Sequence, residues 1–124
     1  MNNKIYSFVK NYYEFLDSNA CLNELLVFFY EKDFQIIEGK MLIDSFEKYS
    51  LWYENVSKVF LQKKHIIRHL NIEEKDSFID IQIDMDFEAT KASGESIKIE
   101  NAKITWQVIN INNELKIKKY EINI

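Results

Sequence analysis

The stretch IDIQIDMDFEA, residues 79–89, has the strictest pattern in the sequence, because apolar and polar residues alternate along it. Side chains on a β-strand point alternately to the two faces of a sheet, so this pattern predicts one buried face and one hydrated face. The hydrated face carries four acidic side chains, Asp80, Asp84, Asp86 and Glu88. The stretch therefore predicts a long, half-buried strand.

The strands that follow change parity along their length. Apolar residues occupy odd positions at Ile97 and Ile99 but even positions from Ile104 to Val108. One extra residue in a strand produces such a change, so we expect a β-bulge at residues 100–103. The last strand slips in the same way between Ile117 and Tyr120. Turn-forming residues separate these segments, and together they predict a meander of long, bent antiparallel strands.

The first half of the sequence has a helical period instead. The first apolar set predicts a helix that ends near Asp17: Ile5, Phe8, Val9, Tyr12, Phe15 and Leu16. A shorter helix is expected from Leu22 to Phe29, followed by a strand at residues 33–38 that Gly39 closes. The most regular set, with steps of three and four, predicts a long helix: Leu42, Phe46, Tyr49, Tyr53, Val56 and Phe60. Helices followed by a curved sheet make an α+β domain, with a pocket at the mouth of the curved sheet.

Length and composition limit what this domain does. The 124 residues fit a single domain, residues 1–124. Only two glycines and one cysteine occur, which excludes Gly-rich phosphate loops, an intrachain disulfide and multi-cysteine metal sites. The net charge is −4, and the longest apolar run, Leu25 to Tyr30, is far too short to span a bilayer. We expect a cytoplasmic protein with no cofactor and with neither a nucleic-acid nor a membrane partner.

Several short strings resemble the nuclear transport factor 2-like superfamily, which includes the SnoaL-like and ketosteroid isomerase-like proteins. They are Tyr12-Tyr13-x-x-Leu16-Asp17, Leu25 to Tyr30, Asp33, Glu38-Gly39, Tyr49-x-x-Trp52-Tyr53 and the closing 116–120 segment. The resemblance covers the whole chain. It implies a cystatin-like cone in which three N-terminal helices pack on a strongly curved antiparallel sheet. It also implies a pocket between the long helix and the sheet, and a homodimer through the outer sheet face.

Two charged residues are candidates for the polar end of that pocket. Asp33 follows an aromatic pair near a position where members of this superfamily carry an acidic pocket residue, although a turn aspartate has the same sequence features. Arg68, the only arginine, shares the parity of Ile66 and Leu70 and is expected to face inward, unless a bulge turns it outward. An inward Arg68 near Asp33 predicts a site for a small carboxylic ligand.

The two histidines, His65 and His69, are the remaining candidates for acid–base chemistry. On a strand they lie about 13 Å apart, too far to share one metal ion, so no metal site is expected. Their parity is opposite to that of Ile66 and Leu70, which predicts outward side chains. Similar dehydratases use a pocket histidine as base, and on that resemblance His69 joins Asp33 as a catalytic candidate.

Four aromatic side chains are expected to line the pocket: Tyr12, Trp52, Tyr53 and Trp106. Aromatic residues at helical spacing also build ordinary cores, so both interpretations stay open. The function predicted first is small-molecule binding between the long helix and the sheet. The alternatives are a SnoaL-like isomerase, dehydratase or cyclase for a small apolar substrate, and a protein-interaction module. The residues alone do not decide whether the chain is an enzyme.

Overall fold

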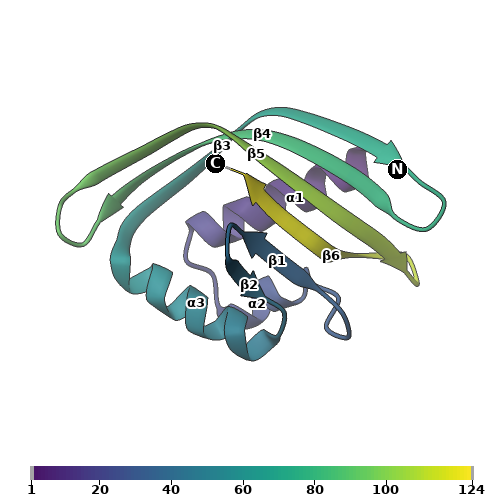
Figure 1. The fold of residues 1–124 in the computed structure, drawn as a ribbon, viewed down its shortest axis with the longest axis horizontal. Helices are drawn as coiled ribbons and strands as arrows, with labels where there is room; N and C mark the ends of the chain where they lie inside the picture. Colours follow the sequence, from purple (N-terminus) through teal and green to yellow (C-terminus); the bar gives the residue numbers. More distant parts are fainter. Residues whose placement is uncertain (1, 124) are drawn as a thin grey trace.

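The computed structural model describes residues 2–123, which form three helices and one six-stranded sheet (Figure 1). The elements are α1 (Asn2–Asp17), α2 (Leu22–Leu26), β1 (Gln35–Glu38), β2 (Met41–Ile43), α3 (Phe46–Val59), β3 (Phe60–Glu74), β4 (Ile79–Lys91), β5 (Ser96–Ile111) and β6 (Glu114–Asn123). The long strands bend into an arch, and the helices lie on its concave side (Figure 1). Among residues 2–123 no helix is both long and apolar enough to cross a membrane.

The strand order is β2-β1-β6-β5-β4-β3, and all neighbours are antiparallel except β1 and β6. The α+β class and the curved sheet are confirmed, but the sheet is mixed rather than purely antiparallel. Strand β2 was not expected from the sequence, because Leu42 belongs to the helical periodicity of the segment that follows. Gly39 has a φ of 57°, which allows the tight turn that folds β2 back on β1.

Helix α3 begins later than the periodicity suggests because Ser45 caps it. The Ser45 hydroxyl accepts a hydrogen bond from the Lys48 backbone N–H at 3.2 Å, which satisfies one free donor of the first turn. The helix ends at Val59, and Phe60 already opens β3. Helix α2 is also shorter than expected, because Phe29 leaves the helix and pairs with Ile117 in an isolated bridge.

The register shifts at four places in the sheet. The two bulges expected from parity are confirmed: β5 carries an extra residue beside Asn101, which has a φ of 59°, and β6 carries one between Ile117 and Lys119. The other two shifts lie in β3, one between Phe60 and Gln62 and the second, a bulge, between Ile67 and His69. It leaves Arg68 as the extra residue and reverses the parity of the strand at that point.

The core fills the space between the helices and the concave face of the sheet. Alternate residues of β4 provide one wall, from Ile79 to Met85, and all of them are buried. Trp106 at the centre of β5 is completely buried and contacts aromatic rings from α1 and β6. The predicted apolar faces of α1, α3 and β4 therefore meet in a single core.

Candidate functional site

A cavity of about 250 Å³ lies between α3 and the concave face of the sheet. The apolar alternation of β4 and β5 and the inner face of α3 give it mainly apolar walls. Its lining comes from the end of α1, from α3 and from five strands: Leu16, Glu38, Trp52, Val56, Phe60, Lys63, His65, Met85, Phe87, Ile99, Ala102, Ile104, Tyr120 and Ile122. The few polar side chains in this set are Glu38, Lys63, His65 and Tyr120.

His65 is held by Asp17, the last residue of α1. The two Asp17 oxygens bind different groups: Oδ1 lies 2.5 Å from His65 Nδ1, and Oδ2 accepts the His65 backbone N–H at 2.7 Å. Both side chains are largely covered, at 14% and 20% exposure. This double contact fixes the imidazole ring relative to the end of the helix. With Nδ1 bound to the carboxylate, Nε2 is the ring nitrogen left for a ligand.

The bulge at Arg68 decides which histidine faces the cavity. Before the bulge, Lys63, His65 and Ile67 point toward the concave side, where they pair with Ala89, Phe87 and Met85 of β4. After it, Leu70 and Ile72 point inward, so His69 points outward opposite Asp84. The expectation that both histidines face outward is thus corrected for His65. The outward direction of His69 agrees with its parity.

Two aromatic rings fix the plane of the His65 imidazole. The Tyr13 ring centroid lies 4.8 Å from it and that of Phe87 lies 4.7 Å from it. The Tyr13 hydroxyl is paired with the Tyr120 hydroxyl at 2.5 Å. Burial raises the pKa of both phenols well above the ordinary value, so both stay protonated. Tyr120, which lines the cavity, is therefore a neutral phenol.

The expected pair of Arg68 and Asp33 does not form. The guanidinium of Arg68, turned outward by its bulge, binds Asp86 through Nε at 2.7 Å and through a terminal nitrogen at 2.6 Å. Asp33 lies in an exposed turn, where its Oδ2 is 3.6 Å from Nζ of Lys118 on β6. Two strands, β5 and β4, separate β6 from β3, the strand of Arg68. The alternatives that the sequence left open apply instead: a bulge turns Arg68 outward, and Asp33 is a turn aspartate. A carboxylic ligand held by Arg68 inside the cavity loses its structural basis.

The four aromatic candidates separate into two groups. Trp52 lines the cavity, and Tyr53 lies next to it, with its hydroxyl donating to the Ala20 carbonyl at 2.6 Å. Tyr12 and Trp106 are fully buried in the core behind the cavity, and Tyr12 pairs with the Tyr49 hydroxyl at 2.8 Å. Of the predicted site residues, Trp52 is in the cavity lining, and Tyr53 follows it on α3 without lining the cavity. The structure places Asp33, Arg68 and His69 on the outside.

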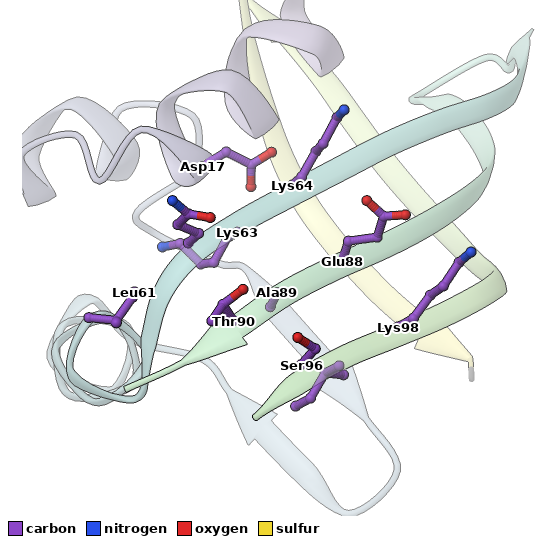
Figure 2. Close-up of a pocket in the computed structure, with 11 residues that line it drawn as sticks. Asp17, Leu61, Lys63, Lys64, Glu88, Ala89, Thr90, Ser96 and Lys98 are labelled. Atoms are coloured by element: carbon purple, nitrogen blue, oxygen red, sulfur yellow. The ribbon is translucent and has the colours of Figure 1, made fainter. Parts of the chain in front are cut away.

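An open groove of about 650 Å³ adjoins the cavity across β3, β4 and β5 (Figure 2). Asp17 lies beside it at the end of α1, and Lys64, Glu88 and Lys98 give it a charged surface (Figure 2). Lys63 lines both the groove and the cavity. Across residues 2–123 no three histidine, cysteine or acidic side chains gather as a metal site would require.

The pairing of Asp17 with His65 is the part of the candidate site that sequence reasoning missed, since Asp17 was no candidate and His65 was expected to face outward. Asp17 has the sequence features of a helix end, and His65 stands directly before two adjacent isoleucines that hide the parity of its strand. The available signal was an acidic residue at the end of a helix, combined with a histidine near the start of a strand that packs on that helix. Neither residue indicates the other without the register of β3.

The fold was compared with known proteins. No protein-family model matches the sequence, and no curated protein matches it. Solved structures do match. A putative scytalone dehydratase from Novosphingobium aromaticivorans is 16% identical with a TM-score of 0.86, and the match covers 96% of this chain and 80% of that one. A type 2 hexachlorocyclohexane dehydrochlorinase, LinA, is 17% identical with a TM-score of 0.83, covering 96% and 81%. A nuclear transport factor 2-like superfamily protein from Salmonella enterica is 13% identical with a TM-score of 0.83, covering 98% and 88%.

Proposed function

The chain has the nuclear transport factor 2-like cone fold, and from this premise we propose that it binds a small, largely apolar molecule in its cavity and removes a proton from carbon. The reaction class is a dehydration or an isomerisation. The observation that carries the proposal is His65, held by Asp17 in the cavity wall. Two solved structures of this fold are named as a dehydratase and a dehydrochlorinase, which supports elimination chemistry in such a cone.

The proposed base is Nε2 of His65. With Nδ1–H donating to Asp17, Nε2 carries the lone pair that accepts the proton. Asp17 keeps the ring in this orientation and stabilises the imidazolium that forms. The same carboxylate accepts the backbone N–H of His65, so ring and strand are fixed together. Asp17 is a positioning residue in this scheme, and His65 is the catalytic residue.

The proposed partner of the base is Tyr120. Removal of a proton next to a carbonyl group places negative charge on oxygen, and a neutral O–H donor stabilises that charge. Tyr120 stays protonated because burial raises its pKa. Its bond to Tyr13 holds the hydroxyl in place. The apolar walls from Trp52 to Ile104 exclude water and set the preference for an apolar substrate.

The test uses hydrogen–deuterium exchange at the α-carbon of 2-tetralone, a small apolar ketone, followed by NMR in D₂O. We expect the protein to accelerate exchange, and His65→Gln to reduce the acceleration by about 10²-fold or more. Asp17→Asn should reduce it as well, because the amide no longer fixes the same tautomer. His69→Gln is the matched control on the outer face of the same strand and should retain full activity. Equal exchange with the wild type and His65→Gln would exclude His65 as the base and leave a binding role only.

We further propose that the molecule is a homodimer joined through the outer face of the sheet. The helices cover only the concave side, so the convex side of β4, β5 and β6 is left for a second copy (Figure 1). Thr105, Gln107 and Ile109 of β5 form the middle of that face, between acidic side chains of β4 and the lysines of β6. Such a mixed surface is typical of non-obligate contacts. The absence of a nucleic-acid partner and a cytoplasmic location remain predictions from composition.

A further inference from the structure

Lys63 is a buried amine without a hydrogen-bond partner. Its side chain is 8% exposed, and Nζ makes no hydrogen bond within residues 2–123. Burying a lysine in this way is costly, because an ammonium ion in an apolar environment needs hydrogen-bond acceptors or a counter-ion. Other lysines, such as Lys103 and Lys118, point outward and meet carboxylates. The position of Lys63 therefore calls for a role that an exposed lysine does not fill.

The surroundings of Lys63 place this residue in the lining of the cavity. It leaves β3 on the concave side, two residues before His65, and both line the same cavity. Nζ lies 5.5 Å from the centre of the Tyr53 ring of α3, in a cation–π contact. The residue that pairs with Lys63 on β4 is the small Ala89. Lys64, the next residue, is exposed and lies across from Glu88.

We propose that Lys63 is a nucleophilic amine that forms an imine with an aldehyde or ketone bound in the cavity. The nitrogen lone pair adds to the carbonyl carbon, and the carbonyl oxygen leaves as water with the two protons of the amine. The new C=N bond replaces the C=O bond, so no oxidant or reductant is needed. His65, next on the same strand face, is placed to carry a proton from nitrogen to the leaving oxygen. This covalent step goes beyond the proposed proton abstraction, which does not use Lys63.

The electrostatics of the site support a nucleophilic amine. Desolvation by burial lowers the pKa of Lys63, and the nearby charge of Asp17 opposes this only in part. A lysine whose pKa is lowered is less often protonated at neutral pH, and the neutral amine is the nucleophile. The titratable groups around it are the Asp17 carboxylate from α1, the Tyr53 phenol from α3 and the His65 imidazole from its own strand. The Glu38 carboxyl group of β1 and the Tyr120 phenol of β6 line the same cavity.

Reductive trapping tests the proposal. The full chain is incubated briefly with benzaldehyde and sodium cyanoborohydride, which reduces an imine to a stable benzylamine, and the adduct is located by peptide mass mapping. We expect the first benzyl group on Lys63, ahead of every surface lysine. Lys63→Met should lose this early adduct, and Lys64→Met, the exposed neighbour on the same strand, should keep it. Circular dichroism of both variants checks that they fold.

Two results would overturn the proposal. One is an early adduct spread over surface lysines with no preference for Lys63, which the wild-type peptide map reveals even if Lys63→Met fails to fold. The other is the same early adduct in a folded Lys63→Met variant. The trapping experiment measures mass added to a lysine. The exchange experiment measures the loss of the α-proton NMR signal of the ketone. An adduct on Lys63 without His65-dependent exchange would therefore uphold this inference while removing the proposed function, and the opposite pattern would do the reverse.

Discussion

Two pairs of tyrosine hydroxyls lie in the core, and each hydroxyl depends on its partner. Tyr12 and Tyr49 are both fully buried, and their oxygens are 2.8 Å apart. Tyr13 and Tyr120 form the second pair beside His65. A buried hydroxyl that loses its only partner keeps the full cost of its lost hydration. In each pair, therefore, one hydroxyl contributes to stability only while the other is present.

A double-mutant cycle on the first pair measures this dependence. We expect Tyr12→Phe and Tyr49→Phe each to lower the free energy of unfolding by about 1–3 kcal/mol, because each leaves one buried hydroxyl unpaired. The double variant should lose much less than the sum of the two, since both polar groups are then absent. Urea unfolding of the four proteins provides the numbers. Strictly additive losses would mean that the two hydroxyls do not interact.

At the residue scale, the sequence predicted which face of the sheet a side chain points to where apolar and polar residues alternate. It predicted this poorly where they do not alternate. Residues 79–89 alternate strictly, and their inward and outward sides follow the prediction. In the segment from His65 to His69 two isoleucines stand side by side, and the parity taken from Ile66 and Leu70 is wrong before the bulge. The extra residue was Arg68, and only the pairing of β3 with β4 reveals it. The base of the proposed site was hidden by this one residue.

At the scale of elements, Asp86 connects two bulges. Its side chain points to the convex face yet is almost completely covered, because it binds groups from both neighbouring strands. Oδ1 accepts the Asn101 backbone N–H of the β5 bulge at 3.0 Å, and Oδ2 binds the Arg68 guanidinium of the β3 bulge. Asp86, one of the acidic residues of the predicted hydrated face, thus connects the β5 bulge with the bulge at Arg68 in β3.

Replacing Asp86 tests this connection. We expect Asp86→Ala to lower the Tm by several degrees at neutral pH, because Asn101 and Arg68 lose their acceptor. Asp84→Ala is the matched control: it removes an exposed pair with Lys103 and should change the Tm little. Thermal unfolding followed by circular dichroism gives both values. If Asp84→Ala lowered the Tm as much as Asp86→Ala, the connection of the two bulges by Asp86 would have no special effect on stability.

The same comparison has a defined pH dependence. The Asn101 N–H, and next the Arg68 guanidinium, lower the pKa of Asp86 below its ordinary value of 3.8. The folded state thus favours the ionised form, and its contribution to stability is present above that ordinary value and is lost as the pH falls through the lowered one. The Tm difference between the wild type and Asp86→Ala should therefore be full at neutral pH and shrink in strong acid. A difference that grows on acidification would contradict this assignment.

At the scale of the whole molecule, the arrangement of layers could be predicted, and the site could not. Periodicity placed the helices before the sheet and located two of the four register shifts. It missed β2, whose three residues are too few for a pattern, and the parallel pairing of β1 with β6, which no local signal encodes. The site depends on contacts between α1 and β3, and such contacts emerge only after the strands are in register.

The proposed homodimer is tested at this scale by light scattering. We expect twice the mass of the chain at high protein concentration, and a monomer for Thr105→Arg, because a two-fold interface would place two bulky charges near its centre. Lys98→Glu, far along β5 from that centre, serves as the control and should stay dimeric. A monomeric wild type at every concentration would contradict the outer-face dimer.

The pairing of β1 with β6 also determines the order in which the chain can fold. Strands β3 to β6 are joined by hairpins, so each pairs with a strand that is its neighbour in the sequence. Gln35 of β1, in contrast, pairs with the distant Lys119 of β6. Closing so long a loop is slow, so the β1–β2 hairpin is expected to dock last. During synthesis the first half of the chain leaves the ribosome well before its partner strand exists. Its apolar helices must then stay unpaired until the sheet is complete, and the period of exposure to aggregation and proteolysis lasts until the final strand has been made.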